Sequence, residues 1–532
     1  MLHKLLFILT VCACLPQFTY AVEPVKFIAQ DKTDTLGLIP KPQSLELSKG
    51  SLTLKNKMTF SFPKALSKEA LLLSGYLKHD LKISLKKTKP AKADIILKID
   101  KSIKHDEAYK LEVNSTTVRI KAKTAQGIFY GIQTLRQLLP TKGEYAEVYR
   151  LPLLKIADQP RFQWRGFMLD SCRHMQSIEF IKKYIDHIAS YKMNIFHWHL
   201  TEDEAWRMEI KKYPKLTEIG SKPGKEGQEL NGFYTQEEMK EIVRYANKRH
   251  IKVIPEFDIP GHVNALLVSY PEYLCNDEKS LTIGPPSMRA FSKDGRRALC
   301  AGKAKTLPFV MDIYKEMQEI FTDGIIHIGG DERPKGVWEK CKYCTAKQKE
   351  LGLKSASDLQ NWFLNEVSEG LRKRKVRSMA WDEHIEGGVP KEQIVHAWQN
   401  TKALDAVKLG HSVVNSVNGF FYLDYPAHGK ELNQYAGWMR GLRLPTKKIY
   451  NYEPVPAHFT PAEKARIIGV ESPLWTETVK MDRVDKMVFP RILATAESAW
   501  TSKANKSWPS FQQRFAVHRS VLDSKDIQYD KQ

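Results

Sequence analysis

The sequence predicts an α/β protein: a (β/α)8 barrel of the TIM-barrel type, preceded by a small α+β domain. Two observations carry this prediction. After residue 160, eight short apolar stretches typical of buried strands alternate with helical patterns. Before residue 156, short strand-like stretches are segregated from two helical patterns, as in an α+β domain. The 532 residues are long enough for two or three domains.

The first 21 residues have the pattern of a secretory signal peptide. Lys4 precedes an apolar run over residues 5–15, and Ala21 ends a possible cleavage motif, Thr-Tyr-Ala. A competing interpretation takes residues 11–14, Val-Cys-Ala-Cys, as a lipoprotein box with a lipid anchor at Cys14. Both interpretations predict export to a periplasmic or extracellular location. No internal run approaches the ~18 apolar residues of a membrane span, so we expect no transmembrane segment.

The chain is basic, with a formal net charge of +22. Lysines are spread over stretches such as residues 82–104, which favours a solvated basic surface. Attraction to polyanions, including sulfated glycans, is the alternative. No pattern resembles a nucleic-acid-reading module, so we expect no nucleic-acid partner.

Five cysteines lie beyond the N-terminal segment. In an exported chain, Cys275 with Cys300 and Cys341 with Cys344 are candidate disulfides, which leaves Cys172 free. The spacing of Cys341 and Cys344 also suits half a zinc site, but no second ligand pair follows at zinc-finger spacing. We therefore expect structural cysteines and no metal or other cofactor.

The predicted domains are residues 36–156 for the α+β domain and residues 160–525 for the barrel. Helical patterns at 177–193, 235–250, 307–321 and 357–375 separate the earlier barrel strands. A doubly wound α/β fold is the alternative, but no glycine-rich phosphate loop follows a first strand. The predicted barrel strands are 166–170, 194–199, 252–257, 325–329, 376–381, 394–398, 412–416 and 467–471.

Acidic and tryptophan residues follow almost every predicted barrel strand. In a (β/α)8 barrel, the carboxyl ends of all strands meet at one face, where active sites lie. Tryptophan rings stack on sugar faces, while carboxylates and arginines bind sugar hydroxyls. The composition of this face therefore predicts a carbohydrate site.

The most informative stretch is residues 327–332, His-Ile-Gly-Gly-Asp-Glu. Its two glycines allow the chain to leave a buried strand and pass close to another group. Two adjacent carboxylates repel each other, so one is protonated more easily, as a general acid requires. An exposed acidic turn or a metal corner is the alternative for the motif alone. Glycoside cleavage usually takes two carboxylates that face each other across the bond. Adjacent carboxylates suit a variant in which the substrate supplies the nucleophile.

These motifs together resemble glycoside hydrolase family 20, the β-N-acetylhexosaminidases. The resemblance rests on residues 38–43 and 127–135 in the first domain and on Arg165-Gly166 with Leu169-Asp170 and Arg173-His174, 258–262, 327–332 and 469–475 in the barrel. It implies an exo-acting, retaining enzyme that removes terminal β-linked N-acetylglucosamine or N-acetylgalactosamine from an oligosaccharide or glycoconjugate. It also implies catalysis assisted by the substrate through an oxazolinium intermediate. A transglycosylating relative and a non-catalytic glycan-binding protein on the same scaffold are the alternatives.

The resemblance further implies roles for single residues. Glu332 matches the general acid/base, Asp331 the residue that orients the 2-acetamido group, and Tyr422 the residue that binds its carbonyl oxygen. Arg165 matches the arginine that holds the 3- and 4-hydroxyls. The remaining matches are Asp424 and Glu477 as hydroxyl-binding acids, Trp381, Trp398 and Trp475 as subsite walls, His262 and Asp258 as a supporting pair, and Trp438 as a loop tryptophan.

One departure from the family pattern stands after the second barrel strand. The family often has two aspartates there, and this chain has Glu202-Asp203. Glu202 is one methylene longer than aspartate, so we expect its contact with the His262 network to be kept with some shift. The sequence expresses no preference between gluco and galacto sugars or for any oligomeric state.

Overall fold

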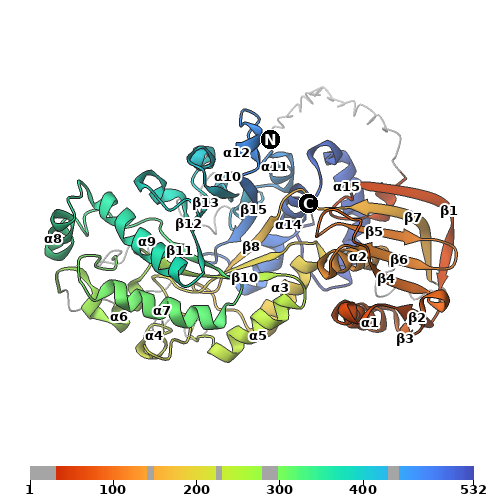
Figure 1. The fold of residues 1–532 in the computed structure, drawn as a ribbon, viewed down its shortest axis with the longest axis horizontal. Helices are drawn as coiled ribbons and strands as arrows, with labels where there is room; N and C mark the ends of the chain where they lie inside the picture. Colours follow the sequence, from red (N-terminus) through yellow and green to blue (C-terminus); the bar gives the residue numbers. More distant parts are fainter. Residues whose placement is uncertain (1–31, 140–148, 223–230, 278–296, 429–441, 532) are drawn as a thin grey trace, which may run out of the picture.

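The protein is described from a computed structural model, shown in Figure 1. The structure describes residues 32–139, 149–222, 231–277, 297–428 and 442–531. The predicted signal segment and Trp438 lie outside these ranges. A seven-stranded sheet stands at the right of the view, and a closed barrel fills the rest. The structure therefore confirms the predicted fold class.

The N-terminal sheet is mixed, with the strand order β1-β7-β5-β6-β4-β2-β3. The ladders β1–β7, β7–β5 and β5–β6 are antiparallel, and the other three are parallel. Helices α1 (Ser67–Leu81) and α2 (Ala125–Gln137) accompany the sheet. A Cβ atom on Gly131 would lie 2.6 Å from Ile120 Cγ2, so glycine is what lets α2 approach the sheet. The strands are β1 (Ser44–Leu54), β2 (Lys57–Ser61), β3 (Ser84–Lys87), β4 (Ile95–Ile99), β5 (Tyr109–Val113), β6 (Val118–Ala122) and β7 (Tyr149–Asp158).

The second sheet is a closed barrel of eight parallel strands, in the order β10-β11-β12-β13-β14-β15-β8-β9. Each overlaps a strand that the sequence predicts, and the last strand pairs with the first. Most of their residues are buried, as expected of parallel strands covered on both faces. The strands are β8 (Trp164–Asp170), β9 (Ile195–His199), β10 (Lys252–Ile259), β11 (Ile325–Gly329), β12 (Arg377–Trp381), β13 (Ile394–Ala397), β14 (Ser412–Asn415) and β15 (Ile467–Leu474).

Helices cover the barrel, and those between its early strands lie where the sequence predicts them. Helix α5 begins with a capping box in which Thr235 and Glu238 satisfy each other's backbone N–H groups. Short 3-10 segments, η8 (Asp382–Gly387) and η9 (Thr401–Leu409), follow β12 and β13. No described helix has both the length and the apolar character needed to cross a bilayer. The larger helices are α3 (Ile178–Ser190), α5 (Gln236–Asn247), α7 (Thr306–Ile320), α8 (Lys342–Glu350), α9 (Ala356–Lys373), α14 (Arg491–Trp500) and α15 (Trp508–Asp523). The shorter ones are α4 (Lys215–Glu218), α6 (Asn264–Ser269), α10 (Asn418–Phe421), α11 (Thr446–Asn451), α12 (Pro461–Lys464) and α13 (Val484–Val488).

Buried polar contacts join the two domains at the amino-terminal end of the barrel, where α2 contacts α3 (Figure 1). Arg165, at the start of β8, donates to the carbonyls of Phe162 and Lys192, both at 2.7 Å. Its guanidinium also binds Glu107 and the Tyr130 hydroxyl of the first domain. We call this interface, centred on Arg165, the seam.

The cysteines contradict the disulfide prediction. All five described cysteines are free and buried. Cys275, Cys300, Cys341 and Cys344 gather in one place, with Sγ–Sγ distances of 3.6 Å (Cys300–Cys341), 3.7 Å (Cys300–Cys344) and 4.0 Å (Cys275–Cys344). A disulfide needs about 2.05 Å. Pairing by nearness in sequence fails here because chain segments from two barrel loops bring all four thiols together.

Candidate active site

The motif at residues 327–332 lies at the carboxyl end of β11, between β10 and β12. Gly329 has φ +69°, and a Cβ atom there would lie 1.7 Å from Asp258 Oδ1. The N–H of Gly330 donates to the same oxygen at 3.1 Å. The glycines are thus required because the Asp258 carboxylate packs directly against the backbone of the turn.

The two acids that follow differ in exposure. The Asp331 side chain is 12% exposed, whereas that of Glu332 is 40% exposed. His262 Nε2 lies 3.8 Å from Asp331 Oδ2 and 3.5 Å from Glu332 Oε2. Its other nitrogen, Nδ1, is 2.8 Å from Glu202 Oε1. One imidazole therefore links the second-strand loop to both acids, and Glu202 keeps the expected contact with His262.

Electrostatics in the immediate surroundings of Asp331 favour protonated carboxyls. Burial raises the pKa of Asp331, and the Glu332 charge adds to this effect. Burial and the Asp331 charge raise the pKa of Asp258 well above its usual range. Burial alone would lower the pKa of His262, but the carboxylates of Glu202 and Asp331 raise it well above normal. The cluster consequently combines a cationic imidazole with acids that hold protons at higher pH than usual.

Two further carboxyls, to which the sequence motifs assign no role, belong to the same cluster. Glu383 accepts a hydrogen bond from the Glu332 N–H at 2.9 Å. Burial and the Asp331 charge raise the pKa of Glu383 to about 7. Burial also raises the pKa of Asp382 to about 7. Their place directly after Trp381 at a strand end was the signal that could have identified them.

Aromatic side chains surround the acids. Trp398 and Tyr422 stack with ring centroids 6.2 Å apart and planes 17° apart, and Trp475 lies 6.3 Å from Tyr422. Burial raises the pKa of Tyr422 well above normal, so its hydroxyl remains a proton donor. Trp381 lies deeper, fully buried, stacked on His396 at 4.1 Å and donating to Glu256 at 2.8 Å. Trp398, Tyr422 and Trp475 therefore surround the acids at the carboxyl end of the barrel, and Trp381 lies beneath them. We call this region, around Asp331, Glu332 and these aromatic residues, the mouth.

Polar atoms at the mouth lack partners. Both carboxylate oxygens of Asp424 and the Trp398 Nε1 are buried without a hydrogen-bond partner among the described residues. Such atoms are costly unless a ligand or water satisfies them. Burial and the charge of Glu477 raise the pKa of Asp424 well above normal. Asp424 is thus suited to bind a hydroxyl-bearing ligand.

The assignment of Arg165 to this site is wrong. Arg165 lies at the opposite end of β8, where the seam holds its guanidinium. The arginine at the mouth is Arg173, which is 2% exposed. It pairs with Glu202 at 2.5 Å, Asp170 at 3.1 Å and Glu477 at 3.5 Å. The position of each arginine along β8 could have distinguished them, because Arg173 follows the carboxyl end of the strand and Arg165 precedes most of it.

The structure brings the other predicted residues together at one face, apart from Trp438, which lies outside the described residues. Glu202, Asp203 and His262 are close enough to share a metal ion. The guanidinium of Arg173 beside Glu202 already supplies the positive charge there, which disfavours a cation.

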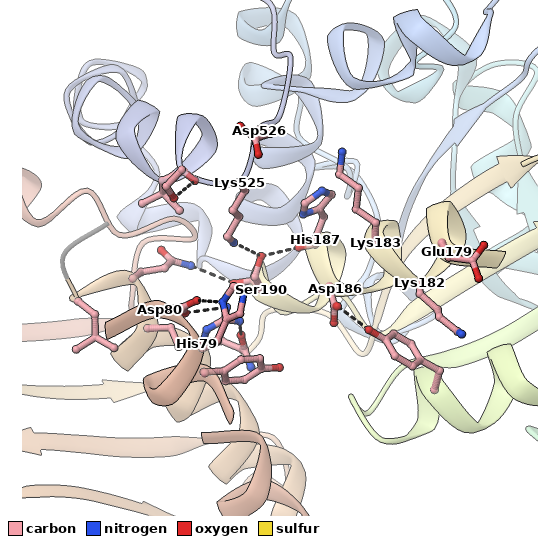
Figure 2. Close-up of a pocket in the computed structure, with 18 residues that line it drawn as sticks. His79, Asp80, Glu179, Lys182, Lys183, Asp186, His187, Ser190, Lys525 and Asp526 are labelled. Carbon is pink, nitrogen blue, oxygen red and sulfur yellow. Dashed lines mark hydrogen bonds and ion pairs between the residues drawn. The ribbon is translucent and has the colours of Figure 1, made fainter. Parts of the chain in front are cut away.

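A separate cavity of about 700 Å³ lies away from this face, between α1, α3 and the C-terminal segment (Figure 2). Its labelled side chains include His79, Asp80, Asp186 and Lys525, and Lys525 Nζ lies 3.4 Å from Ser190 Oγ. Burial and the charge of Arg136 lower the pKa of Lys525 to about 7. This cavity lies at the seam end of the molecule and contains none of the predicted site residues.

Comparisons with known proteins agree with this geometry. The model of the glycosyl hydrolase family 20 catalytic domain matches residues 162–503, and that of domain 2 of the same family matches residues 35–159. A β-hexosaminidase of Porphyromonas gingivalis is 37% identical over 93% of this chain and 64% of its own length. One from Vibrio furnissii is 34% identical over 88% of this chain and 77% of its own. This chain thus spans less than two thirds of the first relative.

Solved structures are similar over the whole described fold. The exo-β-N-acetylglucosaminidase of Vibrio harveyi, solved with N-acetylglucosamine, superposes with a TM-score of 0.84 at 32% identity, over 93% of this chain and 78% of that one. The β-N-acetylhexosaminidase of Bacteroides fragilis gives a TM-score of 0.82 at 31% identity, over 92% and 96%.

Proposed function

This chain belongs to glycosyl hydrolase family 20, and from that premise we propose that it is an exo-acting, retaining β-N-acetylhexosaminidase. Its substrates are oligosaccharides or glycoconjugates that end in β-linked N-acetylglucosamine or N-acetylgalactosamine. The observation that carries the proposal is the difference in solvent exposure between two adjacent acids. Glu332 reaches solvent, while Asp331 is buried and close enough to Tyr422 for its charge to act on that hydroxyl.

The proposed reaction begins with the acetamido group of the substrate. Its carbonyl oxygen attacks the anomeric carbon as Glu332 protonates the departing glycosidic oxygen. Asp331 accepts a hydrogen bond from the acetamido N–H and stabilises its growing positive charge. The Tyr422 hydroxyl donates to the acetamido oxygen and holds it in line. Water, deprotonated by Glu332, then opens the oxazolinium and returns the acetamido group, with retained configuration.

The exo mode follows from the groups that surround the terminal sugar. Arg173 takes the role first assigned to Arg165 and, with Asp424 and Glu477, would bind the outer hydroxyls. Arg173 and Asp424 are buried, and the Arg173 guanidinium lies 5.4 Å from the centre of the Trp475 ring. Such enclosed groups fit the end of a glycan better than its interior. A non-catalytic glycan-binding protein is disfavoured because Asp331, Glu332 and Tyr422 are all present.

The test is hydrolysis followed by NMR. We expect β-N-acetylglucosaminides to release the β-anomer first; an α-anomer as first product would rule out the double displacement. A panel of aryl β-N-acetylglucosaminide, β-N-acetylgalactosaminide, their 6-sulfated forms and chitobiose would identify the preferred donor. Absence of turnover on every member would overturn the proposal.

We also propose that the chain is exported, on the strength of Lys4 and the apolar run that follows it. The mass of the mature protein distinguishes cleavage after Ala21 from lipid attachment at Cys14. A mature chain that retains Met1 would contradict both.

A further inference from the structure

Two barrel loops meet at the four-cysteine cluster formed by Cys275, Cys300, Cys341 and Cys344. The first two lie between β10 and α7, and the last two lie at the start of α8, after β11. All four are buried, and their sulfur atoms lie within 4.8 Å of one another. The cluster therefore joins the loop that carries His262 to the loop that carries Asp331 and Glu332.

The spacing of the sulfurs fits one tetrahedral metal ion. A zinc–sulfur distance of about 2.3 Å places the sulfurs of a tetrahedral site about 3.8 Å apart. The three close pairs measure 3.6, 3.7 and 4.0 Å, on either side of that value. A pair of disulfides would require two much shorter distances and would leave the other contacts unexplained.

The backbone around the cluster adopts conformations that bring the four cysteines close together. Asn276 and Asp277, directly after Cys275, both have positive φ, at 53° and 58°. A Cβ atom on Gly302 would lie 2.1 Å from the backbone of Tyr343, so only glycine allows the Cys300 segment to pass so close to Cys344. Cys341 is the N-cap of α8, where the helix favours the negative charge of a thiolate.

Hydrogen bonds hold the two loops in register beside the sulfurs. The Asn276 side chain donates to the Lys340 carbonyl at 3.0 Å and accepts from the Lys342 N–H at 2.9 Å. Asp277 accepts from the Tyr343 hydroxyl at 2.7 Å and pairs with Lys303 at 2.9 Å. These contacts orient the segments that carry the cysteines, as hydrogen bonds around the ligands do in metal sites.

We infer that the four-cysteine cluster binds one Zn²⁺ ion as a closed structural site. Each thiol loses its proton when the ion binds, which gives four thiolate ligands and no open position for substrate or water. Thiolates select zinc over the hard cations Mg²⁺ and Ca²⁺. The sequence spacing suggested half of such a site, and Cys275 and Cys300 supply the other half from an earlier loop.

The site would position the catalytic loops from a distance. The Leu299 N–H, next to Cys300, donates to the Pro260 carbonyl at 2.9 Å, two residues before His262. Trp338, three residues before Cys341, donates to the Leu299 carbonyl at 2.9 Å. The ion would thus fix the relative position of the two loops without touching substrate.

Metal analysis of the full chain tests the inference. Purified without reductant or chelator, the protein is expected to contain one equivalent of zinc by mass spectrometry. Cys341→Ser and Cys344→Ser are expected to lose it, whereas Cys172→Ser, at a buried cysteine outside the cluster, is expected to keep it. Zinc below a tenth of an equivalent, with the four cysteines found as disulfides by non-reducing peptide mapping, would overturn the inference. Unchanged zinc in Cys344→Ser would also overturn it.

A second measurement does not depend on the variants folding. Wild-type chain produced with Co²⁺ in place of zinc is expected to show the intense visible absorption of tetrahedral cobalt bound by thiolates. Bound cobalt without that absorption would contradict the assigned ligands. Both measurements are independent of the enzymatic activity, so their outcome is separate from that of the proposed function.

Discussion

The two ends of strand β8 each hold a buried arginine, and the two have different surroundings. Arg165, near the start, binds backbone carbonyls, a hydroxyl and one carboxylate at the seam. Arg173, just past the end, lies among Asp170, Glu202 and Glu477. Both guanidiniums are desolvated, but the seam satisfies its arginine mainly with neutral groups and with the single carboxylate of Glu107. The mouth surrounds Arg173 with excess negative charge.

The difference indicates that the role of a charged residue on a barrel strand depends on the end of the strand at which it lies. Contacts at the amino-terminal end of the barrel hold the two domains together, whereas charge at the carboxyl end is available for chemistry. Substitutions at the seam should therefore change stability, and those at the mouth should change turnover.

The largest expected effect is at the exposed acid of the mouth. Glu332→Gln should lower turnover of an unactivated N-acetylglucosaminide by about 10²- to 10⁴-fold, because the leaving oxygen loses its proton donor. Thermal unfolding should change little, since the Glu332 side chain is partly exposed. Steady-state kinetics and a melting curve check both statements. Near-normal activity, or a large loss of stability, would contradict the statement that substitutions at the mouth change turnover and not stability. A substrate with a strongly acidic leaving group should be much less affected.

The next effect concerns the buried acid. Asp331→Asn should lower turnover of 2-acetamido substrates by about 10²-fold or more, because the oxazolinium loses its charge partner. The matched control is the same sugar with a 2-hydroxyl in place of the acetamido group. Equal losses on both substrates would show that Asp331 does not act on the acetamido group.

The same substitution at both arginines is the most direct test. Arg173→Lys keeps the charge but loses the planar fork, so kcat/KM should fall about 10- to 100-fold, as for the loss of a charged hydrogen bond. Arg165→Lys should leave kcat/KM nearly unchanged and lower the unfolding free energy by about 2 kcal/mol. Kinetics and chemical denaturation of both variants are compared side by side. Exchanged outcomes would reverse the assignment of the two arginines.

The smallest expected effects are on the pH dependence of stability, to which Glu383 and Lys525 contribute with opposite signs. Glu383 has a pKa of about 7 in the folded protein and a lower one when unfolded. The folded state therefore binds more protons, and this group lowers stability as pH rises from about 4.5 to 7. Lys525 has a folded pKa of about 7 and an unfolded one near 10.4, so it raises stability as pH rises through that window.

Melting temperatures measured across pH test these slopes. Glu383→Gln should reduce the change in melting temperature between about pH 4.5 and 7, and Lys525→Met the change between about pH 7 and 10.4. Each reduction should be roughly 2 °C. Wild-type slopes that persist in both variants would assign the pH dependence to other groups.

The sequence was sufficient for the architecture because strand and helix patterns are local. All eight barrel strands overlap their predicted positions, since buried parallel strands read as short apolar runs. The motif at residues 327–332 was equally informative, because its glycines and acids are consecutive.

Contacts between distant segments were beyond the sequence. Arg165 and Arg173 are eight positions apart, and only the end of the strand on which each lies separates their roles. Cys275 and Cys344 meet across two loops, so spacing alone suggested the wrong partners. Glu383 acquires its altered pKa from burial beside Asp331, and no local pattern reports burial of that kind.

The closure of the barrel has a consequence for how the protein is made. Trp164 and Glu471 contact each other across the junction of β8 and β15, yet they are 307 residues apart in the chain. A Cβ atom on Gly166 would lie 2.2 Å from the Glu471 carboxylate, so this junction is tightly fitted. Synthesis at about 5–20 residues per second therefore leaves β8 without its second neighbour for roughly 15 to 60 s. During that interval one edge of β8 lacks its strand partner, and an unpaired strand edge is a site where another chain can pair.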